Sequence, residues 1–355
     1  MNSAKHIALV YTSKQRAQEV NSDRHPETLK ADDDEPPDLY SEYDTAETVS
    51  AVKEALLRKY EVTAIEGDTS AFERLRELKP DLVFNISEGF CGPNRESHIP
   101  IVCEMLGLRY TGSDGLTLSI CLDKARTKEI LTHHKIPNAK FMVWNAGDGS
   151  AKLKRFPLPA IVKPLREGSS VGIRNNSMVS SVDELIERSA EIAGVYRQPV
   201  LIEEFLTGRE FTLGFLGNAP HLEFLPLIEI NHSVLPKGAN PIYGYEAKWL
   251  WDDPANPLPV LICPAMVEPA LLKKIHAMAS KAAKVLNIRD WCRLDLRLNA
   301  SGVPKILELN PLPGVLPDPK ENSSLPTAAR AMGMTYEQLI LKVAKIAEER
   351  TSAAK

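Results

Sequence analysis

Apolar and polar positions in the first third of the chain follow two periods in turn. Short, mainly apolar runs predict three strands, at HIALVY (6–11), EVTAIE (61–66) and DLVFNIS (81–87). Apolar positions spaced three or four residues apart predict helices over 45–59, 100–108 and 116–134. Strands that alternate with helices indicate a parallel, doubly wound sheet, whose ligands gather at the carboxyl ends of the strands. The polar, glycine-containing loop at 87–97 follows a strand and is therefore a candidate wall of a site.

Two polar segments show no such period. Residues 12–44 contain three prolines and an acidic run from Asp32 to Glu35, which predicts a long exposed loop. The proline-rich segment 231–259 is either a mobile flap or a plain surface loop.

From about residue 137 the pattern changes to strands joined by glycine-containing turns. Strands are predicted at 156–164, 171–176, 199–206 and 209–217, the first two paired with each other. Ser181 and Glu184 have the spacing of a capping box, which predicts a helix that opens there and closes near Gly194. A further amphipathic helix is predicted over 267–286.

The stretch Trp291–Gly314 reads WCRLDLRLNASGVPKILELNPLPG and predicts a β-hairpin with one polar face. A two-residue turn at Ser301-Gly302 would place Asp295 opposite Glu308, with Asn310 one step along the same face. Opposed carboxylates repel each other, so a cation between them is expected, and magnesium prefers such oxygen ligands. A half-solvated pair of strands with an acidic outer face is the alternative.

Two further patterns suggest anion and nucleotide chemistry. Lys163 ends an apolar strand and precedes REGSSVG, where backbone N–H groups and the hydroxyls of Ser169 and Ser170 could cradle an anion. A hairpin turn with an exposed lysine explains the same residues. Strand alternation sends Glu203 and Glu204 to opposite faces, so one of them needs a buried donor, such as an adenine amino group or a basic side chain.

Composition sets outer limits on function. The 355 residues are 43% hydrophobic and 25% charged, which is typical of a soluble chain of two or three domains. A net charge of −4 gives no reason to expect nucleic acid or an anionic membrane as partner, and no apolar run is long enough to span a bilayer. The chain lacks a secretory signal pattern, CxxC spacing and HxxxH spacing. These features predict a cytoplasmic protein with reduced thiols.

The order of these motifs resembles that of the ATP-grasp superfamily and, within it, the D-alanine–D-alanine ligases. The resemblance runs from Asp81 to the C-terminus and is carried by segments at 108–128, 156–173, 200–217, 245–250 and 293–314. It implies an α/β protein, α+β in its C-terminal part, with an ATP-grasp fold behind an N-terminal doubly wound parallel sheet. The implied domains are 1–115, 116–205 and 206–355, the last of which carries the magnesium site.

The resemblance also implies roles for particular residues. ATP would be bound by Lys124, Lys163, Ser170, Glu203, Phe205, Leu206, Glu210 and Lys248. Within this set Glu203 would meet the adenine amino group, Glu210 the ribose hydroxyls and Lys248 the γ-phosphate. Magnesium, or manganese in its place, would be held by Asp295, Glu308 and Asn310. The reacting groups would be contacted by Arg293, Ser169, Ser324 and backbone donors at Gly314.

The implied reaction is the ATP-dependent joining of a carboxylate to an amine through an acyl phosphate. Small amino-acid-like substrates and a homodimer are implied with it, and the segment 231–259 would be the lid that excludes water.

Departures from the family pattern concern the first amino-acid pocket. The family's N-terminal motif, with its substrate-binding glutamate, is replaced by YTSKQRAQEV and the 12–44 segment, where Glu42 or Asp44 could substitute. Glu88-Gly89 stands where the family has His-Gly, polar residues around 94–97 replace Gly-Glu-Asp-Gly, and Trp249 replaces a tyrosine. These changes predict a carboxyl donor other than D-alanine.

Several alternatives remain open. An orthodox cell-wall D-alanine–D-alanine ligase and a specialised-metabolite ligase, such as a mycosporine-type enzyme, are two of them. A degenerate nucleotide-binding protein without catalysis is a third. A nicotinamide-dependent dehydrogenase has little support, because HIALVYTSKQ lacks GxGxxG.

Overall fold

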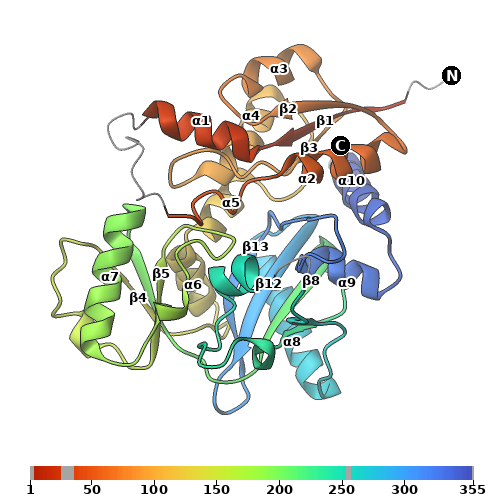
Figure 1. Cartoon of the computed structure of the whole chain (residues 1–355). Coiled ribbons are helices and arrows are strands. Elements are labelled where there is room, and N and C mark those ends of the chain that lie inside the picture. Colours follow the sequence, from red (N-terminus) through yellow and green to blue (C-terminus); the bar gives the residue numbers. More distant parts are fainter. Residues whose placement is uncertain (1–3, 25–35, 253–256, 354–355) are drawn as a thin grey trace.

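The computed structural model describes residues 4–24, 36–252 and 257–353. Its N-terminal part is a parallel sheet of β1 (His6–Tyr11), β2 (Glu61–Glu66) and β3 (Leu82–Asn85) in the order β2-β1-β3. Alternate residues of β1 face opposite ways: Ile7 and Leu9 pack with α2 (Ala46–Leu57), whereas Ala8 and Val10 pack with α3 (Ala71–Leu78) and α4 (His98–Leu106). Helices therefore cover both faces, which confirms the predicted doubly wound sheet (Figure 1).

The predicted exposed loop at 12–44 is wrong for the residues that the structure describes. Lys14–Arg24 forms helix α1, which lacks an amphipathic pattern and so gave no periodic signal. Residues 36–44 are tied down by polar contacts. Asp38 is fully buried and accepts hydrogen bonds from the Tyr196 hydroxyl at 2.8 Å and from the Gly172 amide at 2.9 Å. The acidic run at 32–35 lies outside the described residues.

The central part begins with two helices where one was predicted. α5 (Gly115–Leu122) and α6 (Lys124–His133) are separated by Asp123, whose carboxylate accepts a hydrogen bond from the Arg126 amide at 3.1 Å and so caps α6. The cap fixes where α6 starts and therefore where Lys124 points. A short 3₁₀ turn over Arg95–Ser97 precedes these helices.

The central sheet has the order β4-β7-β5-β6 and is antiparallel. Its strands are β4 (Phe141–Trp144), β5 (Ala160–Pro164), β6 (Met178–Val179) and β7 (Val200–Glu204), with 3₁₀ turns at Leu153–Arg155 and Asn175–Ser177. The predicted strand at 171–176 is wrong, because β6 is the segment that pairs with β5. The capping box of Ser181 and Glu184 is confirmed and opens α7, which spans Val182–Tyr196.

The C-terminal sheet has the order β11-β10-β8-β12-β13, and β9 pairs with β8. Its strands are β8 (Glu210–Asn218), β9 (His221–Phe224), β10 (Ile228–Ile230), β11 (Leu261–Ile262), β12 (Trp291–Leu298) and β13 (Pro304–Asn310). α8 (Pro269–Val285) packs Ile275 and Ala282 against Leu294 and Leu296 of β12. The opposite face of β12 carries Arg293, Asp295 and Arg297, which the buried leucine face leaves pointing into a cavity.

The predicted pairing of Asp295 with Glu308 is correct, but the turn that was expected to set it is not the one observed. Asp295 pairs with Glu308, as expected, but the strands end at Leu298 and Pro304, so the loop is 299–303 rather than a two-residue turn. Leu296 pairs with Ile306, which leaves Leu307 as an extra residue in β13. This bulge offsets the longer loop and returns Asp295 and Glu308 to opposite positions.

The chain ends by returning to the N-terminal sheet. α9 (Ser324–Ala331) lies against β8, and α10 (Tyr336–Ala353) packs along α2, as Figure 1 shows. A 3₁₀ turn at His232–Val234 and a π-helix at Glu246–Leu250 lie between β10 and β11. Among the described residues no helix combines the length and the apolar character needed to cross a membrane.

Candidate active site

A cavity of about 540 Å³ is lined by residues of the N-terminal, central and C-terminal parts of the chain. The structure brings every residue predicted for the site to its wall. These residues are Lys124, Lys163, Ser169, Ser170, Glu203, Phe205, Leu206, Glu210, Lys248, Arg293, Asp295, Glu308, Asn310, Gly314 and Ser324. The volume is in the range of small-molecule sites.

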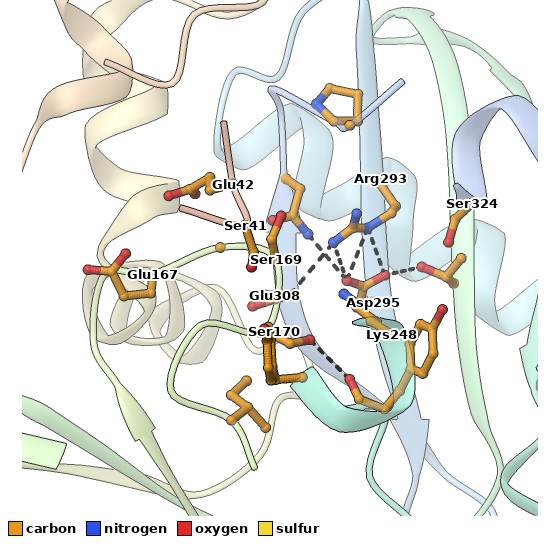
Figure 2. A pocket seen from close by; sticks show the side chains of 18 of the residues that line it. Ser41, Glu42, Glu167, Ser169, Ser170, Lys248, Arg293, Asp295, Glu308 and Ser324 are labelled. Atoms are coloured by element: carbon orange, nitrogen blue, oxygen red, sulfur yellow. Dashed lines mark hydrogen bonds and ion pairs between the residues drawn. The ribbon is translucent and has the colours of Figure 1, made fainter. Parts of the chain in front are cut away.

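Asp295 is the centre of the polar contacts in this cavity (Figure 2). Its carboxylate forms an ion pair with Arg293 at 3.0 Å and accepts hydrogen bonds from the Asn310 amide at 3.2 Å and from the Thr212 hydroxyl. Glu308 lies opposite, with its Oε1 3.9 Å from Nη2 of Arg293. The predicted convergence of the three oxygen-bearing side chains is therefore found.

The two central carboxyl groups differ in their electrostatics. Burial and the neighbouring Glu308 raise the pKa of Asp295, although Arg293 opposes the shift. Burial also acts to raise the pKa of Glu308, but Lys124, Lys163 and other cations outweigh it, and the pKa of Glu308 falls below its usual range. Glu308 is thus held in its ionised form, whereas the ionised form of Asp295 is disfavoured. A cation bound between the two would stabilise both carboxylates.

Three lysines approach this centre from different elements. Lys124, the first residue of α6, donates to the Glu167 carbonyl at 2.5 Å and lies 3.6 Å from Oε2 of Glu308. Lys163 comes from β5 and Lys248 from the π-helix. Burial and the nearby Arg293 guanidinium lower the pKa of Lys248 to about 8. Such a cluster of cations needs anions, and phosphate groups would supply them.

Glu203 lies between two lysines in this structure. Its side chain is almost fully buried and forms ion pairs with Lys128 and, at 2.5 Å, with Lys163. Burial alone would raise the pKa of Glu203, but the two ammonium groups lower it. Lys128 was not predicted as a site residue. It lies one helical turn after Lys124 and therefore shares a face of the helix with it, which could have indicated its position. The adenine contact of Glu203 stays a prediction, and its carboxylate is already paired.

A second set of contacts surrounds Glu210. Its carboxylate forms an ion pair with Arg297 at 3.0 Å and lies 3.1 Å from Nε2 of His232. The Arg297 guanidinium also lies 4.6 Å from the centre of the Phe205 ring. Arg297 was recognised only as a polar position of the hairpin. Because Arg297 lies two residues after Asp295 on the same strand, the two side chains share a face, and this alternation could have identified Arg297 as a site residue.

The turn at 168–171, here called the serine turn, is held by contacts with Tyr243 and Trp249. Ser169 and Ser170 adopt φ values of 45° and 64°, which are unusual for residues other than glycine. The Ser170 hydroxyl donates to the Tyr243 carbonyl at 3.0 Å, and the Trp249 indole N–H donates to the Ser169 carbonyl at 3.3 Å. These contacts tie the turn to the π-helix and to the residues just before it.

Ser324 lies across the cavity from Ser169, as Figure 2 shows. It is the first residue of α9, after Ser323, whose hydroxyl bridges the Leu316 amide at 3.1 Å and the Gly314 carbonyl at 3.3 Å. The long connection at 311–324 therefore folds back so that Gly314 and Ser324 reach one wall.

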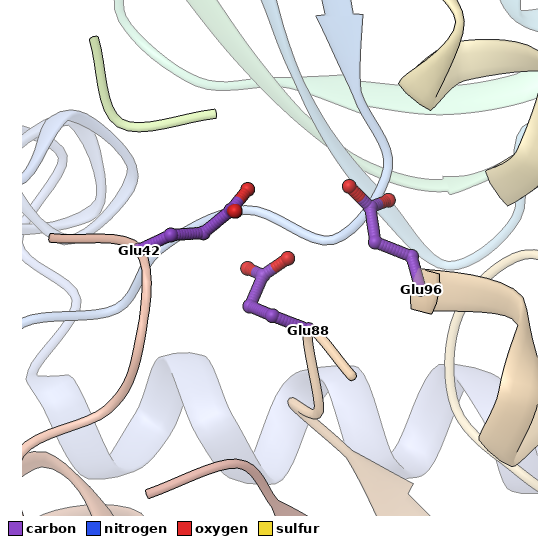
Figure 3. Close-up of side chains that lie close together, drawn as sticks. All are labelled: Glu42, Glu88 and Glu96. Carbon is purple, nitrogen blue, oxygen red and sulfur yellow. The ribbon is translucent and has the colours of Figure 1, made fainter. Parts of the chain in front are cut away.

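The remaining wall is acidic and comes from the N-terminal part. Carboxylate oxygens of Glu42, Glu88 and Glu96, here called the acid trio, all lie within 4.8 Å of one another (Figure 3). Arg95, which sequence reasoning missed, forms an ion pair with Glu42 at 2.6 Å and with Glu167 at 3.3 Å. Of the two substitutes considered for the family's glutamate, Glu42 reaches this group. Asp44 also lines the cavity, where burial raises its pKa to about 8.

Comparison with known proteins defines first the class and then the family. The family model for the C-terminal part of D-Ala–D-Ala ligases matches residues 130–345. A crystal structure of D-alanine–D-alanine ligase from Bacillus anthracis complexed with ATP superposes with a TM-score of 0.69 at 21% identity, over 99% of this chain and all of that one. The fold is therefore an ATP-grasp fold, as expected.

Sequence relatives support the same family. A D-alanine–D-alanine ligase from Ralstonia nicotianae is 35% identical over 246 residues, which is 69% of this chain and 69% of that protein. The uncharacterized protein y4sG of Sinorhizobium fredii is 32% identical over 82% of this chain and 84% of its own. The chain belongs to the D-alanine–D-alanine ligase family, and it is an ATP-dependent, ADP-forming ligase.

Proposed function

We propose that this protein joins the carboxylate of one amino-acid-like substrate to the amine of another, and that the carboxyl donor differs from D-alanine. The observation that carries the proposal is that the residues assigned by resemblance to nucleotide and metal line one cavity, whereas the acid trio lines another part of its wall, with Arg95 paired to Glu42.

Each wall has a part in the proposed reaction. Lys124, Lys163 and Lys248 neutralise the phosphates of ATP, with the N–H groups of the serine turn beside them. Phe205 and Leu206 contact the base, and Glu210, oriented by Arg297, meets the ribose hydroxyls.

Asp295, Glu308 and Asn310 suit a magnesium ion, because they offer hard oxygens on one face and because burial and Glu308 disfavour the charged form of Asp295 when no cation is added. Bound there, the ion would supply charge neutralisation at the phosphates. Manganese has the same ligand preference.

The chemistry follows from these positions. A carboxylate oxygen of the donor attacks the γ-phosphorus, the bond to ADP breaks, and an acyl phosphate forms. The amine then attacks the acyl carbon, inorganic phosphate leaves, and the nitrogen loses one proton to give the amide. Arg293 and the backbone at Gly314 stabilise the oxygen that becomes negatively charged, and Ser169 and Ser324 contact the substrates. The π-helix at Glu246–Leu250 excludes water, which would hydrolyse the acyl phosphate.

An orthodox D-alanine–D-alanine ligase is the second candidate, and the printed function of the Ralstonia nicotianae relative favours it. The acid trio argues for another substrate, since the single ammonium group of D-alanine does not need three carboxylates. By analogy with the family we further propose a homodimer that works in the cytoplasm, where ATP is supplied.

The test is phosphate release from ATP and magnesium with a panel of D- and L-amino acids, followed by mass spectrometry of the products. Amide formation with a donor other than D-alanine supports the proposal. Brisk turnover with D-alanine alone supports the orthodox enzyme, and absence of release across the panel would favour a nucleotide-binding protein.

A further inference from the structure

The acid trio holds more negative charge than the surrounding protein compensates. Glu42 comes from the 36–44 segment, Glu88 follows β3, and Glu96 belongs to the 3₁₀ turn at Arg95–Ser97, so three separate elements bring the carboxylates together (Figure 3). Gly168 of the serine turn has no side chain to block them: a Cβ there would lie 2.2 Å from Glu42 Oε1. The three carboxylates therefore face the cavity at the end where the serine turn closes it.

Among the described residues, only one of the three carboxylates has an ion-pair partner, which is Arg95 on Glu42. Arg95 pairs with Glu42 and with Glu167, and its remaining contact is the Arg166 carbonyl at 2.9 Å. Glu88 and Glu96 have no hydrogen bond or ion pair among the residues that the structure describes. Glu96 is only 8% exposed, and it lines the cavity.

Carboxylates without partners are costly where they are wholly or partly buried, and the pKa values of this group are shifted accordingly. Burial and the neighbouring Glu42 raise the pKa of Glu96 to about 8, and the same causes raise the pKa of Glu88 well above its usual range. A bound cation would offset the repulsion among these carboxylates.

Carboxylate oxygens that all lie within 4.8 Å of one another can be bridged by an ammonium group or by a metal ion. An ammonium that donates hydrogen bonds of about 2.8 Å in tetrahedral directions keeps its acceptors about 4.6 Å apart. A small octahedral ion with ligands at about 2.1 Å keeps adjacent oxygens about 3 Å apart. The aromatic ring of Tyr43, which lines the same cavity, adds a face that attracts organic cations.

We propose that Glu88 and Glu96 bind two amine groups of the carboxyl donor, which is therefore a short diamino acid. This inference rests on the proposed ligase function. Two unpaired carboxylates balance two ammonium groups, whereas an ordinary amino acid brings one. Amines on adjacent carbons are at most about 4 Å apart, given bonds of about 1.5 Å, whereas those of lysine reach about 8 Å. Carboxylate oxygens within 4.8 Å of one another accommodate the two amines of 2,3-diaminopropionate more readily than those of extended lysine.

The orientation of the donor follows from Lys124. Burial raises the pKa of Glu96, and the positive charge of Lys124 opposes this shift. The Lys124 ammonium lies 3.6 Å from Glu308, which belongs to the proposed phosphate and metal site. A donor whose α-amine rests on Glu96 directs its carboxylate toward the phosphates, and its second amine reaches Glu88.

Calorimetry can test this on the full-length protein loaded with magnesium and a non-hydrolysable ATP analogue. The titrants are both enantiomers of 2,3-diaminopropionate, alanine and lysine. One enantiomer of 2,3-diaminopropionate is expected to bind at least ten-fold more tightly than either alanine or lysine. Glu88→Gln should remove that advantage and leave alanine binding within three-fold, because alanine lacks the second amine. Glu96→Gln, which loses the contact to the α-amine, should weaken the binding of both ligands. Glu129→Gln, on the exposed face of α6, is the control, and binding of the analogue verifies that each variant folds.

Each other result has a distinct meaning. Alanine binding as tightly as the diamino acid overturns the inference, and phosphate release with alanine would then leave the ligase function standing. Manganese alone binding at a site that Glu88→Gln and Glu96→Gln remove also overturns it, in favour of a metal site. Glutamate-dependent binding of the diamino acid without amide formation supports the binding site and refutes the ligase function.

Discussion

The ion pair between Lys128 and Glu203 permits a test of how the nucleotide wall is held together. Both side chains are about 1% exposed, and Lys163 is the second cation on the same carboxylate. Removing one partner of a buried pair costs about 3–5 kcal/mol, because an uncompensated charge remains. Since Lys163 stays in place, we expect Lys128→Met to lower the free energy of unfolding by about 3 kcal/mol, the lower limit of that range.

The neighbouring glutamate supplies a matched control. Glu204 lies on the other face of β7 and pairs with Lys305, and these two side chains are 22% and 18% exposed. Solvent screens this pair, so Lys305→Met should cost no more than about 1 kcal/mol. Urea unfolding followed by tryptophan fluorescence measures both variants, since Trp144 lies in β4 beside β7.

Two outcomes would refute the reasoning. Equal losses in Lys128→Met and Lys305→Met would mean that burial does not set the strength of these pairs. Additive losses in Lys128→Met combined with Glu203→Gln would mean that the two groups do not interact, whereas we expect the double variant to lose less than the sum.

Three further predictions concern the cavity. Asp295→Asn should lower turnover by at least about a thousand-fold, the scale of losing a charge-stabilising group in a reaction, with an unchanged unfolding midpoint; near-normal turnover would remove the metal assignment. The kcat/KM for ATP should fall as pH rises through about 8, where Lys248 loses its proton, and Lys248→Arg should move this limb to higher pH; a limb that stays in place would assign it to another group. Glu96 has a folded pKa of about 8, above its unfolded value, so the substrate-free protein should lose stability between about pH 4.5 and 8. Glu96→Gln should weaken this loss, and an unfolding free energy with the same pH dependence in both proteins would argue against it.

The local patterns determined much of the fold. The strands at 6–11 and 61–66 and the capped helix after Ser181 follow from periodicity and end signals that act within a few residues. The hairpin's polar face followed in the same way, because side chains alternate along any strand. Errors occurred where local signals were weak or misleading: α1 has no apolar stripe, and 171–176 has strand-like residues but forms turns with positive φ at Gly172.

Site residues divide along a similar line. Lys163, Asp295, Glu308 and Asn310 could be identified because each stands in a motif with its own strand or turn. Lys128 and Arg95 could not, because their importance comes from partners far away in sequence: Glu203 for one, and Glu42 and Glu167 for the other. A charged residue in a helix looks solvent-exposed until the fold buries it.

The sequence by itself determined the family machinery, the alternation of strands and helices, and the polar residues that ATP chemistry requires. Only the tertiary structure decided that Glu42, Glu88 and Glu96 share one wall, that Glu203 is paired with two lysines, and that the 36–44 segment lies under polar contacts from Tyr196 and Gly172. The physical reason is range. Propensities, caps and alternation act between neighbours in sequence, whereas the pairing and burial of charges depend on which distant segments the packed core brings together.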